Sequence, residues 1–188
     1  QRATLKNGTQ VILAERHDIP VVQFSYEFPG GFTADQGRKS GTANFTMDLM
    51  GEGAGKLGAL PFANAADALG ASLGASASLD GASVYLSALK ENLAPSLALY
   101  ADMLRQPRFD QAEIDRVKAT WIAGIQQEKV NPSAAAMRVL PPLLYGAGHP
   151  YAIPFTGSGN EADIQSLTRA DLVDFRRDWL RPEQGTLI

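Results

Sequence analysis

The sequence contains no cysteine and only two histidines, His17 and His149, which lie far apart in the chain. The absence of cysteine excludes disulfide bonds, thiolate metal ligands and a cysteine nucleophile. A lone histidine is more often a structural polar residue than a catalytic one, so neither histidine is expected to act in catalysis. We expect His149 to be structural, at the start of a loop that Pro150 and Tyr151 fix.

Long apolar runs and an excess of positive charge are also missing. No stretch approaches the roughly 20 apolar residues that a membrane-spanning helix requires. The formal net charge is −3, and the 17 Lys and Arg residues are scattered along the chain, whereas a nucleic-acid-binding protein needs a basic face. We therefore expect neither a membrane span nor a nucleic-acid partner.

The remaining composition is that of an ordinary globular protein. Hydrophobic residues make up 45% and charged residues 20% of the 188 residues, which is enough for one domain with a hydrophobic core. The last residues, Gly185 to Ile188, have the pattern of a strand that ends before it can pair. This pattern predicts a single domain over 1–188 that is truncated at its C-terminus.

The alternation of apolar and polar residues, together with turn residues, predicts the strands. Asn7-Gly8 is a hairpin turn that leads into a strand over 10–14. A second strand is expected over 21–28, with every other residue from Val22 to Phe28 on one face. The clearest hairpin lies between 71 and 89, around a turn at Asp80-Gly81.

Apolar residues at helical spacing predict six helices. They are expected at about 41–50 after Ser40, at 61–70, after Asn92, after Asp110, from Ser133 to an end or bend at Pro141-Pro142, and after a capping box of Thr168 and Asp171. Hairpins imply an antiparallel sheet that helices can cover on one side. The predicted fold class is therefore α+β, a mostly antiparallel sheet covered on one face by helices.

The residues alone indicate no active site. The glycine-rich run from Gly51 to Gly55 follows a predicted helix and lacks the Lys-Ser/Thr pair of a phosphate-binding loop. The serines at positions 72, 76, 78, 83 and 87 have no histidine beside them in the sequence and are expected to be small residues on a packed sheet. No pair of nucleophile and base is visible.

Four stretches nevertheless resemble the zinc metallopeptidase family that includes insulinase, pitrilysin and the mitochondrial processing peptidase, peptidase family M16. They are Phe28-Pro29-Gly30-Gly31-Phe32, the segment from Ser40 to Met50, the segment from Leu99 to Arg116, and the segment that begins at His149-Pro150-Tyr151 and reaches Arg181-Pro182. Together they span nearly the whole chain in the family's order. The resemblance implies an M16-like metallopeptidase fold.

The same resemblance implies that the zinc site is degenerate. Active members carry His-x-x-Glu-His on the helix that matches Ser40 to Met50, since histidines four residues apart can bind one zinc ion and the glutamate acts as general base. Here Asn44 and Asp48 occupy the histidine positions and Met47 the base position. Gly124 stands at the third ligand and Val117 at an assisting glutamate. We therefore expect no catalytic residue, no metal ligand and no cofactor in this chain, and zinc only in a catalytic partner half.

Enzymes of this family consist of two similar halves that enclose a chamber, each half built from two α+β domains. The resemblance implies a non-catalytic domain or subunit that contributes chamber wall and peptide-substrate contacts to a catalytic M16 subunit or fused half. A second similar domain is expected to follow, with the family's supporting Arg and Tyr beyond Ile188, and the bacterial periplasm is the favoured compartment. The alternative is a structural or assembly subunit, like the respiratory-complex core proteins, without a role in proteolysis. An independent enzyme with another site is disfavoured.

Overall fold

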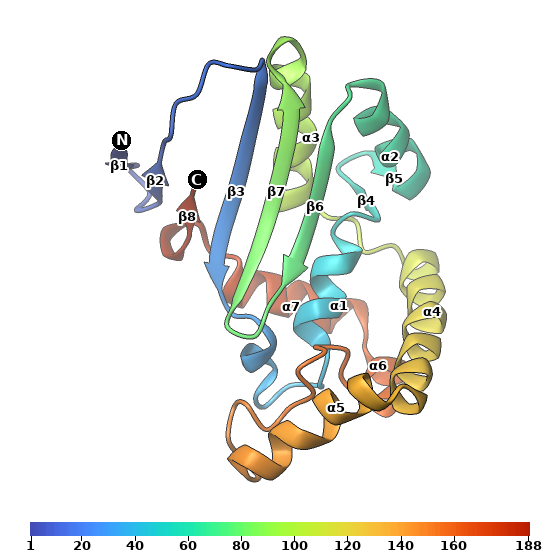
Figure 1. Cartoon of the computed structure of the whole chain (residues 1–188). Helices are drawn as coiled ribbons and strands as arrows, with labels where there is room; N and C mark the ends of the chain where they lie inside the picture. The colour runs from blue at the N-terminus through green and yellow to red at the C-terminus, as the bar shows by residue number, and fades with distance from the viewer.

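Eight strands and seven α-helices follow one another in the computed structural model, which describes residues 1–188 (Figure 1). The strands are β1 (Arg2–Thr4), β2 (Gln10–Ile12), β3 (Val21–Pro29), β4 (Gly53–Ala54), β5 (Leu57–Gly58), β6 (Ser72–Ala77), β7 (Gly81–Leu89) and β8 (Thr186–Leu187). The helices are α1 (Thr42–Leu49), α2 (Ala59–Ala68), α3 (Leu93–Arg105), α4 (Gln111–Val130), α5 (Pro132–Tyr145), α6 (Glu161–Ser166) and α7 (Arg169–Trp179). None of these helices combines the length and the apolar character needed to cross a membrane.

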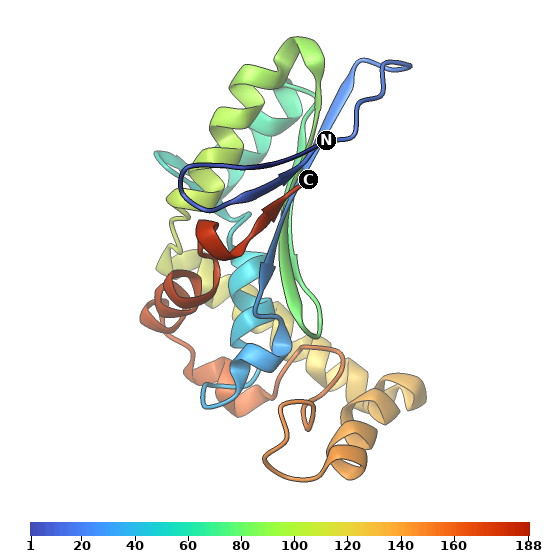
Figure 2. The ribbon, with the colours of Figure 1, turned by 90° about the vertical axis from the view of Figure 1, so that its left-hand side faces the viewer.

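Six of the strands form one sheet, in the order β1-β2-β8-β3-β7-β6, and β4 and β5 form a separate pair. All neighbours in the large sheet are antiparallel except β2 and β8. Helices α2, α3 and α7 lie on one side of this sheet, and its other side is open (Figure 2). The prediction of an α+β fold with a mostly antiparallel sheet covered on one face is confirmed.

Buried and more exposed residues alternate along the central strands and so distinguish the covered face of the sheet from the open one. On β7, Ala82, Val84 and Leu86 are buried beneath the helices, whereas Tyr85 on the opposite face is exposed. In β3, the predicted apolar residues pair with these buried positions, for example Phe28 with Ala82. The predicted face of β3 is therefore the face toward the core.

The C-terminal strand corrects one prediction. Thr186 pairs with Gln10 of β2 in parallel, and Leu187 pairs with Tyr26 of β3 in antiparallel orientation. The backbone N–H of Ile188 also donates to the carbonyl of Ser25 at 2.8 Å. The expectation that this segment ends before it can pair was wrong, because its partners are far away in the sequence.

Of the helix starts expected after Ser40, Asn92 and Asp110, only the first is wrong, because Asn92 and Asp110 occupy the N-cap positions of α3 and α4 although their side chains do not bond to the helix N–H groups. Gly41, not Ser40, occupies the N-cap position of α1, and no side chain caps it at that position. Asn92 precedes α3, but its side-chain amide donates to the carbonyl of Leu69 at 3.0 Å. Asp110 precedes α4, but its carboxylate accepts from a neighbouring arginine. Tertiary or loop partners satisfy these side chains in place of the helix N–H groups.

The capping box at α7 is confirmed, and of the two alternatives predicted for α5 at Pro141-Pro142, an end or a bend, the end is wrong. Thr168 and Asp171 bond reciprocally at the start of α7. Helix α5 continues through Pro141 and Pro142. Pro141 has no N–H for the carbonyl of Met137, and that carbonyl instead accepts from the backbone N–H of Phe155 at 3.0 Å.

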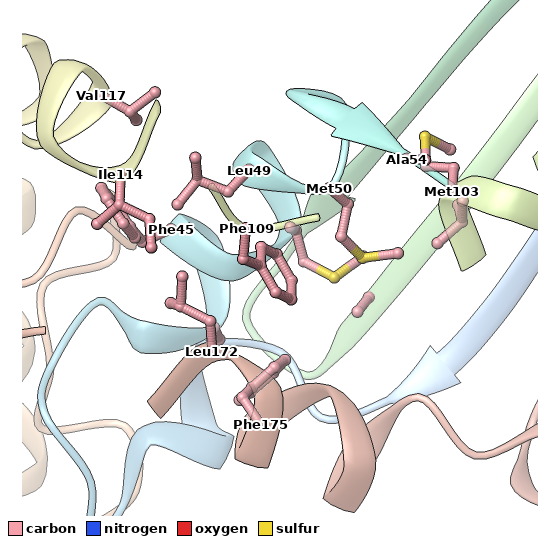
Figure 3. Close-up of a cluster of buried hydrophobic side chains, with 14 of the residues drawn as sticks. Phe45, Leu49, Met50, Ala54, Met103, Phe109, Ile114, Val117, Leu172 and Phe175 are labelled. Atoms are coloured by element: carbon pink, nitrogen blue, oxygen red, sulfur yellow. The ribbon is translucent and has the colours of Figure 1, made fainter. Parts of the chain in front are cut away.

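Helix α1 lies in the middle of the core. Its residues Phe45 and Leu49 belong to one cluster of buried apolar side chains together with Ile114 of α4 and Leu172 and Phe175 of α7 (Figure 3). All five side chains are fully enclosed. The core therefore joins helices that are more than 60 residues apart in the sequence.

Truncation of Phe45 should cost much of the stability of the domain. Phe45 is fully buried, and its ring meets that of Trp121 edge to face, with ring centroids 5.4 Å apart. We expect Phe45→Ala to lower the free energy of unfolding by about 3–5 kcal/mol, measured by urea denaturation, since it leaves a large cavity. Leu60→Ala is the matched control, because Leu60 on α2 is 70% exposed and its loss should change stability by less than about 0.5 kcal/mol. Similar losses in both variants would contradict this assignment of the core.

Candidate functional site

Helices α1 and α4 carry the five positions that resemble a degenerate zinc site, and they pack against each other. Phe45 of α1 contacts Trp121 of α4, as described above. Beyond the end of α1, a carboxylate oxygen of Glu52 lies 2.6 Å from Nη2 of Arg116 on α4. In Figure 3, Phe45 of α1 and Val117 of α4 are seen on neighbouring parts of the same cluster. The fold thus brings the two segments together.

Asn44 and Asp48 lie four residues apart on α1 and therefore on the same side of that helix. Asn44 is half-buried, and Asp48 is exposed as a whole residue although neighbouring groups partly shield its carboxylate from water. Partial burial of its carboxylate raises the pKa of Asp48, the negative charge of Glu52 raises it further, and Arg116 acts in the opposite direction. These two positions offer one amide and one carboxylate beside an ion pair.

The other three positions offer no polar side-chain group. Met47 is fully buried and Val117 almost so, and both belong to the hydrophobic core. Gly124 is exposed, and a Cβ atom placed on it would meet no other atom within 4 Å. The base position and the assisting position are thus filled by core side chains, while the third-ligand position faces open space.

Neither histidine belongs to a metal-binding group. No set of three or more His, Cys, Asp or Glu side chains in residues 1–188 is arranged to hold a metal ion. His17 is exposed and lies 3.6 Å from a carboxylate oxygen of Glu15. His149 accepts a hydrogen bond from the N–H of Tyr151 at 3.0 Å and stacks on Tyr145, consistent with the structural role predicted for it.

The glycine-rich run and the serines have structural neighbours. Gly53 belongs to β4, and its carbonyl accepts from the N–H of Arg108, while the N–H of Gly55 donates to the carbonyl of Gln106. This run is therefore joined to the connection between α3 and α4. The serine hydroxyls of β6 and β7 lie on the open face of the sheet, where two of them approach to 3.1 Å.

A comparison with family models decides what kind of domain this is. The model described as insulinase (peptidase family M16) matches residues 10–145. This range is more than half of the chain, and it includes both α1 and α4. The chain belongs to peptidase family M16. The resemblance stated from the sequence is confirmed.

Curated relatives of this M16 domain include proteins with and without peptidase names. The non-peptidase homolog YmxG of Helicobacter pylori is 26% identical over 162 residues, which cover 86% of this chain and 37% of that protein. The mitochondrial-processing peptidase subunit beta of Rattus norvegicus is 25% identical over 175 residues, which cover 93% of this chain and 35% of that protein. The chain spans little more than a third of the length of these relatives.

Solved structures share the fold over the entire chain. A peptidase M16 inactive domain from Pseudomonas fluorescens matches with a TM-score of 0.94 and 28% identity, covering 100% of this chain and 45% of that chain. The periplasmic protease PqqL from Escherichia coli matches with a TM-score of 0.83 and 18% identity, covering 100% of this chain and 21% of that chain. The second likeness concerns the fold alone.

The N-terminus of α1 in this M16 domain depends on Asp35, a residue that sequence reasoning missed. Its two carboxylate oxygens accept from the backbone N–H groups of Gly41 at 2.7 Å and Ala43 at 2.8 Å. Asp35 is only 6% exposed. Burial raises its pKa to about 7, although these N–H groups and the charge of Arg38 lower it. A capping side chain is expected directly before its helix. Asp35 lies six residues before the N-cap residue Gly41, so no local pattern in the sequence marks it as a cap.

Asp35 should make the domain less stable as the pH rises toward neutrality. Its pKa is raised from 3.8 to about 7 on folding, so between these values the folded state holds a proton that the unfolded state has lost. The free energy of unfolding then falls with increasing pH. We expect this group to contribute a loss on the order of 2 kcal/mol between pH 5 and pH 8, measured by urea denaturation.

Asp35→Asn separates this titration from the capping role. The amide has only one acceptor oxygen for the two N–H groups, so the variant should be less stable than the wild type at low pH. It cannot ionise, so its stability should decline less between the two pH values. An identical pH dependence in the variant and the wild type would show that Asp35 does not titrate in this range.

Proposed function

We propose that this chain is a non-catalytic domain of an M16-type zinc metallopeptidase. In this proposal it contributes chamber wall and peptide-substrate contacts to a partner half that carries the His-x-x-Glu-His motif. The proposal rests on one observation, the packing of the two motif helices and the residues that they carry at the motif positions. Helices α1 and α4 remain packed together, but Met47 and Val117 have become core residues and Gly124 has no side chain.

The residues at these positions do not fit a zinc ion. Protein zinc sites use imidazole nitrogens, thiolates or carboxylates, and catalytic sites use three such protein ligands. Asp48 is one suitable donor, the amide of Asn44 is a poor one, and Gly124 supplies none. The thioether of Met47 cannot accept a proton as a general base. We therefore assign no metal, cofactor or catalytic residue to this chain and place the zinc in the partner half.

The open face of the sheet supports the role of a chamber wall. It is uncovered by helices (Figure 2) and carries polar side chains from the central strands, Gln23, Ser25, Glu27, Ser83, Tyr85 and Ser87. A surface of this composition is suited to contact with water and with a polypeptide backbone. The proposal places this face toward the chamber.

The edge strand β6 supports peptide contacts. The N–H of Ser78 donates to the carbonyl of Gly81 at 2.7 Å. Hydrogen-bonded residues alternate along an antiparallel strand, so Ser76 and Gly74 also bond to β7, whereas the backbone N–H and C=O of Ala75 point away from it. No backbone hydrogen bond joins β6 to a segment on its outer side. The strand contains neither charge nor proline, the devices that normally block edge pairing. An extended peptide can add to such an edge as a further strand.

The descriptions of the relatives support the proposed role, and their length supports a second domain in the complete protein. Two of them carry the descriptions non-peptidase homolog and inactive domain. We also propose the bacterial periplasm as the compartment of this chain; PqqL, which shares only its fold, carries a periplasmic description. Because the relatives are more than twice as long as this chain, we also propose that a second similar domain accompanies it in the complete protein.

A scaffold role without proteolysis is the second candidate. The observation in its favour is the match to cytochrome b-c1 complex subunit 1 of Caenorhabditis elegans, which is 22% identical over 98% of this chain and 38% of that protein. A scaffold needs no peptide-binding edge. Peptide binding at β6 therefore discriminates between the two candidates.

Ala75→Pro tests the peptide contacts of β6. Proline removes an N–H that points outward. The hydrogen-bond ladder between β6 and β7 stays in place, because an edge strand tolerates proline at such a position. We expect the wild-type chain to bind a pool of short unstructured peptides, measured by fluorescence anisotropy, without cleaving them. The variant should bind about three- to tenfold more weakly, the effect of about one hydrogen bond.

Ala75→Val is the matched control, because it keeps the N–H and should bind like the wild type. Equal binding by the proline variant would remove the edge-strand contact from the proposal. No binding by the wild type would favour the scaffold. Cleavage of the peptides by the purified wild-type chain would overturn the non-catalytic assignment.

A further inference from the structure

Gly74 lies in the middle of the edge strand β6 and has no side chain on the open face of the sheet. Its partner on β7 is Tyr85, and directly opposite residues of a strand pair turn their side chains to the same face. Tyr85 is exposed on the open face. Position 74 is therefore a gap on this face, where the edge strand offers only backbone.

The ring of Tyr85 fills this gap. A Cβ atom placed on Gly74 would lie 2.5 Å from Cζ and 2.7 Å from Cε1 of Tyr85, which is too close for two unbonded atoms. The ring thus crosses from β7 to β6 and holds its hydroxyl end over the backbone of Gly74. Only glycine at this position leaves room for the ring.

Tyr85 is also the only large side chain on this part of the open face. In the paired stretch of β6 and β7, the other residues of that face are serines, namely Ser72, Ser76, Ser83 and Ser87. The side chain of Tyr85 stays accessible, since the residue is 42% exposed. A strand that adds to β6 therefore meets a flat surface of hydroxyl groups with one aromatic feature beside the edge.

An added strand would bring one of its own side chains next to this ring, because β6 forms the edge of the sheet (Figure 1). The backbone of Gly74 bonds on its β7 side, so in antiparallel addition Gly74 forms a non-hydrogen-bonded pair with the new strand. The Cα atoms of such a pair lie only about 4.5 Å apart. The peptide side chain at this pair stands on the open face beside the tip of the Tyr85 ring, and no side chain of Gly74 separates the two.

We propose that Gly74 and Tyr85 form a subsite that selects peptides with an aromatic side chain at the residue paired with Gly74. The part of Tyr85 that points toward the added strand is the rim of its ring, which is attracted to the face of a second ring. A cation would instead need the face of Tyr85. The inference rests on the proposed peptide contacts of β6 and adds the class of side chain that they accept.

Fluorescence anisotropy with three matched peptides tests the subsite on the full 188-residue chain. The peptides are short and unstructured, and they differ only in their central residue, which is phenylalanine, alanine or arginine. We expect the wild type to bind the phenylalanine peptide about three- to tenfold more tightly than the alanine peptide, the effect of one aromatic pair. The arginine peptide should bind no more tightly than the alanine peptide.

Variants of the two subsite residues should change the ratio of the phenylalanine and alanine peptide affinities. Tyr85→Ala should bring this ratio close to one, and Gly74→Ala should lower it, because a Cβ atom at position 74 displaces the ring tip. Tyr85→Phe should keep the ratio, since the rim of the ring remains.

Two further variants separate side-chain selection from other effects. Tyr145→Ala is the matched control, because Tyr145 on α5 is 43% exposed and lies outside the subsite, so the ratio should not change. Ala75→Pro should weaken the binding of both peptides and keep the ratio, because it removes a backbone contact that the two peptides share.

The outcomes distinguish this inference from the proposed function. Equal affinities of the wild type for the phenylalanine and alanine peptides, or a preference for arginine, overturn the subsite but not the peptide contacts of β6. A preference for phenylalanine that survives Tyr85→Ala also overturns the subsite alone. A wild type that binds none of the three peptides overturns the subsite together with the proposed peptide contacts.

Discussion

The contact between Phe45 and Trp121 fixes α1 relative to α4, and the other features of this domain depend on that relation. Helix α1 lies between the sheet, α4 and α7, so its apolar side chains connect all three. The carboxylate of Asp35 holds its N-terminus, and the ion pair of Glu52 with Arg116 joins its far end to α4. The geometry of the M16 motif helices therefore rests on packing, capping and this ion pair.

These contacts between protein groups explain how an M16 domain can keep its fold without the His-x-x-Glu-His motif. A glutamate at position 47 or 117 would have to place a charge within the core, which is costly unless the charge is paired. Met47 and Val117 add apolar contacts at the same places instead. Fold and chemistry are thus separate properties, and the proposed role shifts from bond cleavage to contact surfaces, the sheet's open face and the β6 edge.

The sequence predicted those elements whose signals are local. The hairpin at Asp80-Gly81, the apolar face of β3 and the capping box at Thr168 are all set by neighbouring residues, and all three are found. The pairing of β8 and the role of Asp35 depend on contacts between distant segments, which no local pattern records. For the site, the family resemblance located both helices, but only the structure reveals that two of the five positions have joined the core.

The central claim is that the chain keeps the two M16 motif helices, α1 and α4, packed against each other but lacks the zinc ligands. Zinc content after dialysis, measured by elemental analysis, tests it on the wild type and on Asn44→His, Asp48→His, Gly124→Glu. This triple variant alters only exposed or half-buried positions and leaves the core intact. We predict no bound zinc in the wild type and about one zinc per chain in the variant, since three ligands from two packed helices complete a site. A tightly held zinc in the wild type, or none in a folded triple variant, would contradict the account.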